Sequence, residues 1–181
     1  MIYFIADTHF SHEGIIEFCN RPFQTVHEMN ETMIANWNAR ISHGDNVYIV
    51  GDFCWHGGPE NAIDITKRLR GRKHLVKGNH DWKYLEDKDY REQFVRVEDI
   101  IEIVDNGRRI VLCHYPMLEY NGERRGGWHI HGHIHNRKED TFHHLRNKER
   151  VLNAGVDVVG YMPVTFEELV QYNAVHKSSA T

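Results

Sequence analysis

Short runs of apolar residues, rich in valine and isoleucine, recur along the chain and alternate with amphipathic or polar segments. Apolar runs of four to six residues bounded by turn-forming residues predict buried β-strands. The predicted strands cover residues 2–6, 47–50, 74–77, 100–104, 109–113, 128–130 and 151–154.

The clearest helix is predicted over residues 26–41, where apolar side chains recur at every fourth position. These side chains are Met29, Met33, Trp37 and Ile41. Thr25 precedes the segment and Glu28 follows three positions later, which is the capping-box pattern that begins a helix. A second such pair, Thr165 and Glu168, predicts the start of a C-terminal helix.

Strands that alternate with helices indicate an α/β fold whose sheet is at least partly parallel. Sheets of this kind bind ligands at the carboxyl ends of their strands. The length of 181 residues fits one domain. We expect this domain to span residues 1–176 and to be followed by a disordered tail over residues 177–181.

Net charge, cysteine spacing and the lack of long apolar runs indicate which compartment and which binding partners to expect. The 22 Lys and Arg against 26 Asp and Glu give a net charge of −4, which argues against binding nucleic acid or an anionic membrane through overall charge. Cys19, Cys54 and Cys113 are too widely spaced to suggest a disulfide framework and fit a reducing compartment. The N-terminus lacks a basic segment, and no apolar run approaches the ~18 residues of a membrane span. We therefore expect a cytoplasmic protein with no membrane partner, and the sequence makes no prediction of its oligomeric state.

Histidine accounts for 15 of the 181 residues, and neutral imidazole is the commonest metal ligand. Residues suited to metal binding or proton transfer also follow several predicted strands. They are Asp7 and His9, Asp52, Asn79-His80-Asp81, His114, and His133 with His135. Each block alone has an ordinary alternative as a turn or a helix cap. Because all of them would meet at one edge, together they predict a metal-dependent site.

These blocks resemble the five-motif signature of the calcineurin-like metallophosphoesterases. The motifs that carry the resemblance are Asp7-x-His9, Gly51-Asp52, Gly78-Asn79-His80-Asp81, His114 and Gly132-His133-x-His135. The resemblance covers essentially the whole chain and points to the small members without a cap domain, of the bacterial or phage type. It implies a four-layer α-β-β-α sandwich of two mixed sheets, with a dinuclear metal site where the sheets meet.

The resemblance also implies the ligands of two divalent ions per chain. One ion would be bound by Asp7, His9, Asp52 and His135. The other would be bound by Asn79, His114, His133 and, as a bridge, Asp52. Nitrogen and oxygen ligands without thiolate suit Mn, Fe, Zn or Ni better than Mg or Ca, and we favour Mn.

For catalysis, the resemblance implies attack on phosphorus by a hydroxide that bridges the metals. His80 would be the general acid on the leaving-group side, with Asp81 orienting its ring. From the residues alone, Asp81 is equally suited to cap a helix that begins at Trp82.

Other residues are weaker candidates for substrate contacts. His12 and His56 lie just beyond ligand blocks, and Arg124 with Arg125 forms a pair in a glycine-rich loop that suits a second phosphate. The alternative for the arginines is a solvated loop. The basic stretch 67–73 suits nucleic acid, but cations at a helix C-terminus are the more common explanation.

The sequence therefore predicts a metal-dependent phosphoesterase that acts on a small or nucleotide-type phosphodiester. Asp52 is followed by Phe-Cys-Trp-His rather than by the Arg-Gly typical of the family's protein phosphatases, which argues against a phosphoprotein substrate. Nuclease and phosphomonoesterase activities are alternatives at the same site, although nucleic acid is the less favoured partner. A non-catalytic metal-binding scaffold, or a histidine-rich metal store, is the alternative of another class.

Overall fold

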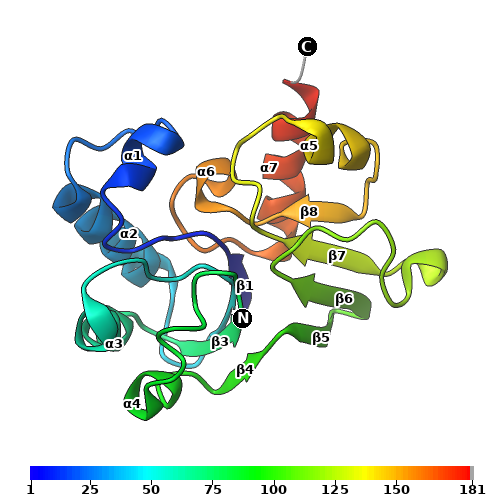
Figure 1. The fold of residues 1–181 in the computed structure, drawn as a ribbon. Helices are drawn as coiled ribbons and strands as arrows, with labels where there is room; N and C mark the ends of the chain where they lie inside the picture. Colours follow the sequence, from blue (N-terminus) through cyan, green and yellow to red (C-terminus); the bar gives the residue numbers. More distant parts are fainter. Residues whose placement is uncertain (180–181) are drawn as a thin grey trace.

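The computed structural model describes residues 1–179, in which two four-stranded sheets form the centre (Figure 1). The first sheet contains β1 (Ile2–Ile5), β2 (Asn46–Val50), β3 (Arg72–Val76) and β4 (Arg96–Glu98). The second contains β5 (Ile100–Asp105), β6 (Arg108–Cys113), β7 (Trp128–His131) and β8 (Val151–Asn153). Both sheets keep their strands in chain order, so each connection joins neighbouring strands.

The strand directions place the polar segments. All three ladders of the first sheet are parallel, and in the second sheet β6, β7 and β8 are parallel whereas β5 is antiparallel to β6. Only the second sheet is therefore mixed in its ladders, and the first gains an antiparallel bridge between Phe4 and Val164 at its β1 edge. The carboxyl ends of β1, β2, β3, β6 and β7 consequently face one region.

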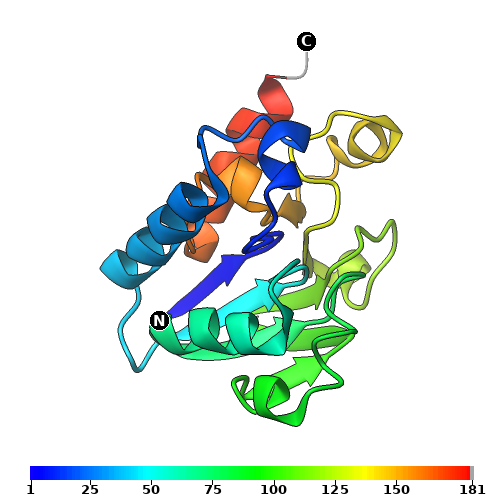
Figure 2. The same ribbon diagram turned by 60° about the vertical axis from the view of Figure 1, so that its left-hand side comes forward.

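Helices cover the outer faces of both sheets. On the first sheet they are α1 (Gly14–Phe18), α2 (Val26–Arg40), α3 (Gly58–Arg68) and α4 (Lys88–Arg91), and Figure 2 shows α2 and α3 along this side. The remaining helices are η1 (Glu123–Arg125), α5 (Asp140–Leu145), α6 (Val156–Val159) and α7 (Phe166–Ser178). Helix α7 packs against β1 and β8, and α5 lies over Val151 on the second sheet. The result is the four-layer α-β-β-α arrangement.

The hydrophobic core consists of two clusters, because successive side chains along a strand alternate between the two faces of the sheet. Ile5 in β1 faces the cluster shared with α2 and α3, whereas the preceding Phe4 faces the second sheet. Successive side chains of a strand point to opposite faces, so both faces of the first sheet are apolar. In β7, Ile130 faces the first sheet, whereas His129 and His131 face outward and are buried beneath the outer layer.

The seven strands predicted from apolar runs are all present, and the predicted helices begin where their caps indicate. The Thr25 side chain accepts the Glu28 N–H, and Thr165 and Glu168 form a complete capping box. The prediction of a disordered tail from residue 177 is wrong at its start, because α7 continues to Ser178 and the Lys177 ammonium donates to the Lys148 and Val151 carbonyls. Residues 180–181 lie outside the described part. No helix within residues 1–179 has the length and apolar character needed to cross a membrane.

Candidate metal centre

Loops that follow β1, β2, β3, β6 and β7 meet at one edge of the sandwich. Backbone hydrogen bonds join them, from the Asp7 N–H to the Gly51 carbonyl and from the Gly132 N–H to the His114 carbonyl, both at 3.0 Å. The seven residues predicted as ligands are brought together here. Six of them have a polar atom within 4 Å of a polar atom of another member of the set. The seventh, His135, has a ring nitrogen within 4.8 Å of possible ligand atoms of Asp7 and His9.

The backbone at these residues adopts the left-handed conformation. Asp7, His9, Asp52, His133 and His135 have φ angles of 54°, 48°, 54°, 71° and 51°. This region is uncommon for residues other than glycine and costs on the order of 1–3 kcal/mol at each position. Local strain concentrated in five of the seven predicted ligands indicates that the fold holds their side chains in place at a cost to stability.

Two motif glycines allow ligand side chains to approach the backbone. A Cβ at Gly78 would lie 2.2 Å from the Asp52 Oδ1, and one at Gly132 would lie 2.5 Å from the Asp7 Oδ2. Neither position has room for a larger residue, because both distances are far shorter than a van der Waals contact. The glycines of the motifs are therefore required for close packing against the carboxylates.

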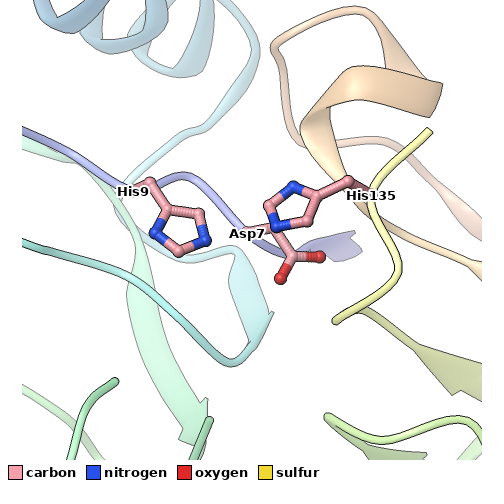
Figure 3. Close-up of side chains that lie close together, drawn as sticks. All are labelled: Asp7, His9 and His135. Atoms are coloured by element: carbon pink, nitrogen blue, oxygen red, sulfur yellow. The ribbon is translucent and has the colours of Figure 1, made fainter. Parts of the chain in front are cut away.

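Asp7, His9 and His135 form a first group, in which one candidate ligand atom from each lies within 4.8 Å of the others (Figure 3). Asp7 is fully buried and His9 is 2% exposed. Neither ring nitrogen of His9 has a hydrogen-bond partner. Leaving a buried polar group unsatisfied costs about 1–3 kcal/mol, so buried imidazoles usually have a partner. A divalent cation beside Asp7 would satisfy this ring.

Asn79, His114 and His133 form a second group. The Asn79 Oδ1 lies 3.0 Å from both the His114 Nε2 and the His133 Nδ1. The His114 Nδ1 lies 3.0 Å from the Val50 carbonyl, which can only accept a hydrogen bond. This contact assigns the ring proton to Nδ1 and leaves Nε2 free to bind a metal.

Asp52 lies between the two groups. Its Oδ2 is 3.7 Å from the His9 Nε2 and 3.4 Å from the His114 Nε2, which places one carboxylate oxygen beside members of both predicted ligand sets. Burial raises the pKa of Asp52, but the hydrogen bond from His114 and the charges of His114 and His9 outweigh burial and lower the pKa to about 2. Burial lowers the pKa of His114, but Asp52 and Asp7 raise it to about 9.

The donor set fits two divalent cations. It combines imidazole nitrogens, carboxylate oxygens and one amide oxygen, a mixture that suits transition metals rather than Ca²⁺. The contact between protonated His114 and Asp52 is the one expected where a metal would replace a proton. The unpartnered His9 supports the same conclusion from the first group.

A buried ion pair that was not predicted supports the first group from behind. Arg21 and Asp157 are fully buried at their side chains, and the Arg21 Nε and one terminal nitrogen donate to the two Asp157 oxygens at 2.8 and 3.1 Å. The same guanidinium donates to the Asp7 and Thr8 carbonyls at 2.8 and 2.9 Å. Asp157 also accepts from the His135 Nδ1 at 3.0 Å, so the pair orients a predicted ligand and the turn that carries another.

The Cys19 thiol completes a further group of three potential ligands with His135 and Asp157. The guanidinium of Arg21 already neutralises Asp157, so a cation at this place would face a buried positive charge. Cys19 therefore belongs to the surroundings of His135, where its hydrogen bond is one cause of the raised pKa of that ring.

Asp81 has partners different from those expected. Its carboxylate accepts the backbone N–H groups of Asp52, Phe53 and Gly78 at 2.8 to 3.0 Å, with no contact to the His80 ring. It therefore ties together the loops after β2 and β3 instead of orienting His80. The alternative of a helix cap is also wrong, because residues 82–86 form turns.

His80 lies at the open side of the centre. Its Nε2 is 3.9 Å from the Asp52 Oδ2, its side chain is 34% exposed, and its ring meets the Trp55 ring edge-on at 4.0 Å. Burial lowers the pKa of His80 despite the nearby charge of Asp52. The ring is therefore positioned to exchange a proton with a group bound in front of Asp52.

The candidate substrate contacts separate into two sets. His12 stacks on Trp55 at 4.4 Å and lies 5.4 Å from the His9 ring, and the exposed His56 lies 5.9 Å from His12. These histidines border the centre. Arg124 and Arg125 in η1 precede β7 and therefore lie at the opposite end of that strand from the ligands. A contact between these arginines and substrate stays a prediction.

The basic stretch 67–73 is occupied by local contacts. Arg68 pairs with Glu31 at 2.6 Å, and the Lys73 ammonium donates to the Leu69 and Gly71 carbonyls just beyond α3. These contacts stabilise the helix C-terminus, as the alternative explanation predicted. The stretch runs into the first two residues of β3 and therefore lies at the end of that strand away from the metal centre.

Comparison with known proteins agrees with the fold and identifies the family. The model of the calcineurin-like phosphoesterase family matches residues 1–175, so the chain belongs to this family of metal-dependent hydrolases. It is similar to an uncharacterized protein of Methanocaldococcus jannaschii, with 36% identity over 94% of this chain and 89% of the relative. The gene 66 protein of Mycobacterium phage L5 is 24% identical over 97% of this chain and 95% of its own length.

A solved structure shows the same architecture. The crystal structure of a protein of unknown function from Aquifex aeolicus superposes with a TM-score of 0.74 and 31% sequence identity. The match covers 94% of this chain and 98% of that one. The relatives extend over essentially the same length, and their names do not state a substrate.

Proposed function

We propose that this protein is a dinuclear-metal-dependent phosphoesterase that hydrolyses a small or nucleotide-type phosphodiester. The observation that carries the proposal is the buried His9, which lies next to Asp7 and Asp52 although neither of its ring nitrogens has a hydrogen-bond partner. We assign the first ion to Asp7, His9, Asp52 and His135. We assign the second to Asp52, Asn79, His114 and His133, and we favour Mn over Fe, Zn or Ni.

Two divalent ions, when bound, would lower the pKa of a coordinated water and neutralise negative charge on the phosphate. The protein itself contributes orientation, since His114 donates to the Val50 carbonyl and His135 donates to the Asp157 carboxylate, which fixes the proton positions on both rings. His80 is the proposed general acid, because its partly exposed ring lies next to Asp52 and is free to donate to a leaving oxygen. Asp81 acts as a positioning residue through the backbone around Asp52.

The preference for a diester rests on the open side of the centre. Asn79, His80 and His133 are partly exposed on that side, whereas His114 is fully buried behind them. A diester carries two substituents and needs this space, whereas a monoester needs only one. We also propose a cytoplasmic location, because Cys19, Cys54 and Cys113 are buried free thiols.

The test is hydrolysis of bis(p-nitrophenyl) phosphate by protein stripped of metal and then reloaded with Mn²⁺. We expect activity only after reloading, and a loss of at least 100-fold in Asp52→Asn. Asp64→Asn, at an exposed position in α3, is the matched control and should behave as wild type. Full activity after removal of all metal would overturn the proposal.

The same preparation separates the alternatives. Faster release of phosphate from p-nitrophenyl phosphate than from the diester would favour a phosphomonoesterase, and cleavage of oligonucleotides would favour a nuclease. Stoichiometric binding of two Mn²⁺ without hydrolysis of any ester would indicate the scaffold, and more than two tightly bound ions would indicate a metal store.

A further inference from the structure

Two exposed aromatic side chains border the metal centre. Phe18 is 61% exposed and meets the His135 ring edge-on at 6.1 Å. Tyr115 is 48% exposed and meets the His133 ring edge-on at 4.8 Å and the His114 ring at 5.2 Å. One ring therefore adjoins a ligand of the first predicted ion, and the other adjoins ligands of the second.

Position distinguishes these rings from ordinary exposed apolar residues, which are common on protein surfaces. Among residues 1–179, the large aromatic side chains that are exposed are Phe18, Trp82 and Tyr115. Trp82 lies over Leu85 and Val97, toward β4, and has no ring contact with a predicted ligand. The other two flank the place where a phosphate would bind.

The surroundings of Phe18 suit a nucleotide. The Arg137 guanidinium lies over the Phe18 ring at 5.4 Å, and its side chain is 38% exposed. The Asn136 side chain donates to the Cys19 carbonyl at 3.1 Å and so ties the end of α1 to the loop that carries Arg137. Arg137 also pairs with the exposed Glu139 at 3.5 Å, and a surface pair of this kind contributes only about 0–1 kcal/mol. Phe18 and Arg137 thus present an aromatic face together with a cation, the two groups that recognise a base and a phosphate.

We propose that Phe18 and Tyr115 are stacking positions for planar rings on the groups esterified to the phosphate, so that the ligand is a nucleoside phosphate. This inference rests on the proposed function and specifies its substrate class. Stacking of a base on an aromatic side chain changes affinity by about tenfold and tolerates any base. The rings thus provide affinity for nucleosides in general, and the metal centre positions the phosphate.

The test compares two ligands with the same phosphate group, thymidine 5′-phosphate and methyl phosphate, by calorimetry on Mn-loaded protein. Phosphate release is monitored in parallel to correct for turnover. We expect wild type to bind the nucleotide about tenfold more tightly than methyl phosphate. The ratio should fall to within twofold of one in the double variant Phe18→Ala, Tyr115→Ala. It should be preserved in Phe18→Trp and in the matched control Trp82→Ala.

Equal affinities of wild type for the two ligands, or an unchanged ratio in the double variant, would overturn the inference. Either result is distinct from failure of the proposed function, which would appear as absence of Mn-dependent hydrolysis of bis(p-nitrophenyl) phosphate. Octathymidylate distinguishes a free nucleotide from a strand as the source of the ligand. If a strand is the ligand, octathymidylate should bind far more tightly than thymidine 5′-phosphate and lose affinity steeply with salt. Because the protein has a net charge of −4, we expect the two ligands to bind with similar affinity instead.

Discussion

Replacing Asp157 by asparagine tests whether the buried ion pair supports the metal centre. The substitution keeps the size of the side chain but removes the charge that neutralises Arg21, whose guanidinium is completely buried. Removing one partner of a buried pair typically costs about 3–5 kcal/mol, because the other charge stays buried and uncompensated. The Asp7 and Thr8 carbonyls still accept from Arg21, which favours the lower part of this range.

The measurements are urea unfolding and thermal unfolding of metal-free protein in EDTA, which separate folding from metal binding. For a chain of this size, a loss of ~3 kcal/mol corresponds to a decrease of roughly 6–12 °C in Tm. The control is Glu31→Gln, which breaks an Arg68–Glu31 contact of 2.6 Å whose side chains are about 40% exposed. Exposed pairs contribute only about 0–1 kcal/mol, so this variant should remain close to wild type.

Metal affinity gives a second measurement on the same variant. Asp157 accepts from the His135 Nδ1, and loss of such a partner lowers the affinity of a metal site by about 10–100-fold. A double variant with Arg21→Met should recover part of the lost stability, because no uncompensated charge then remains buried. Asp157→Asn within 1 kcal/mol of wild type, with unchanged Mn²⁺ affinity, would refute the role assigned to the pair.

Further predictions concern the glycines, the protons and the buried histidines. Gly78→Ala should reduce Mn-dependent activity at least 100-fold with an unchanged far-UV spectrum, because its Cβ would displace the Asp52 carboxylate. Metal binding should release protons at pH 7. The reason is that carboxylates raise the pKa values of His114 and His135 to about 9 and about 10, against the effect of burial, so both rings are protonated before a metal binds. Calorimetry in buffers of different ionisation enthalpy measures the release. Affinity should therefore rise with pH across the neutral range. Burial lowers the pKa of His129, so as the pH falls this ring is protonated in the unfolded chain before it is protonated in the folded protein. The free energy of unfolding should therefore fall below pH 6.5, by at most ~1.4 kcal/mol per pH unit for this group. The fall should be shallower in His129→Gln.

The sequence predicts the strands well because apolar, β-branched runs mark those buried on both faces. Strand β4 was missed because its three residues, Arg-Val-Glu, contain one apolar side chain, and all three are only partly buried at the edge of the sheet. Its pairing with β3 depends on tertiary contacts that a local pattern does not contain. The four-layer arrangement came from the family resemblance and not from periodicity.

The candidate ligands lie at the ends of predicted strands, and one further strand end carries a residue of the site that was not predicted. The last predicted strand, residues 151–154, is followed by Gly-Val-Asp, and its aspartate is Asp157. This residue orients His135, and its place after a strand is the signal in the sequence that points to it. Arg21, by contrast, follows the short helix α1 in a segment that resembles a turn, and only the fold brings it to Asp157.

The metal-free centre combines features that each lower stability. Several of its residues have left-handed backbone, His9 is buried without a partner, and Asp7 and Asp52 lie close together, with burial raising the pKa of Asp7. Such features persist only where surrounding contacts hold them, and here those contacts come from groups that do not bind metal themselves. The guanidinium of Arg21 holds the first loop, and the carboxylate of Asp81 holds the second and third. Cations bound at the centre would neutralise the carboxylates and satisfy His9, so metal binding would stabilise the fold at a place where the chain alone carries these costs.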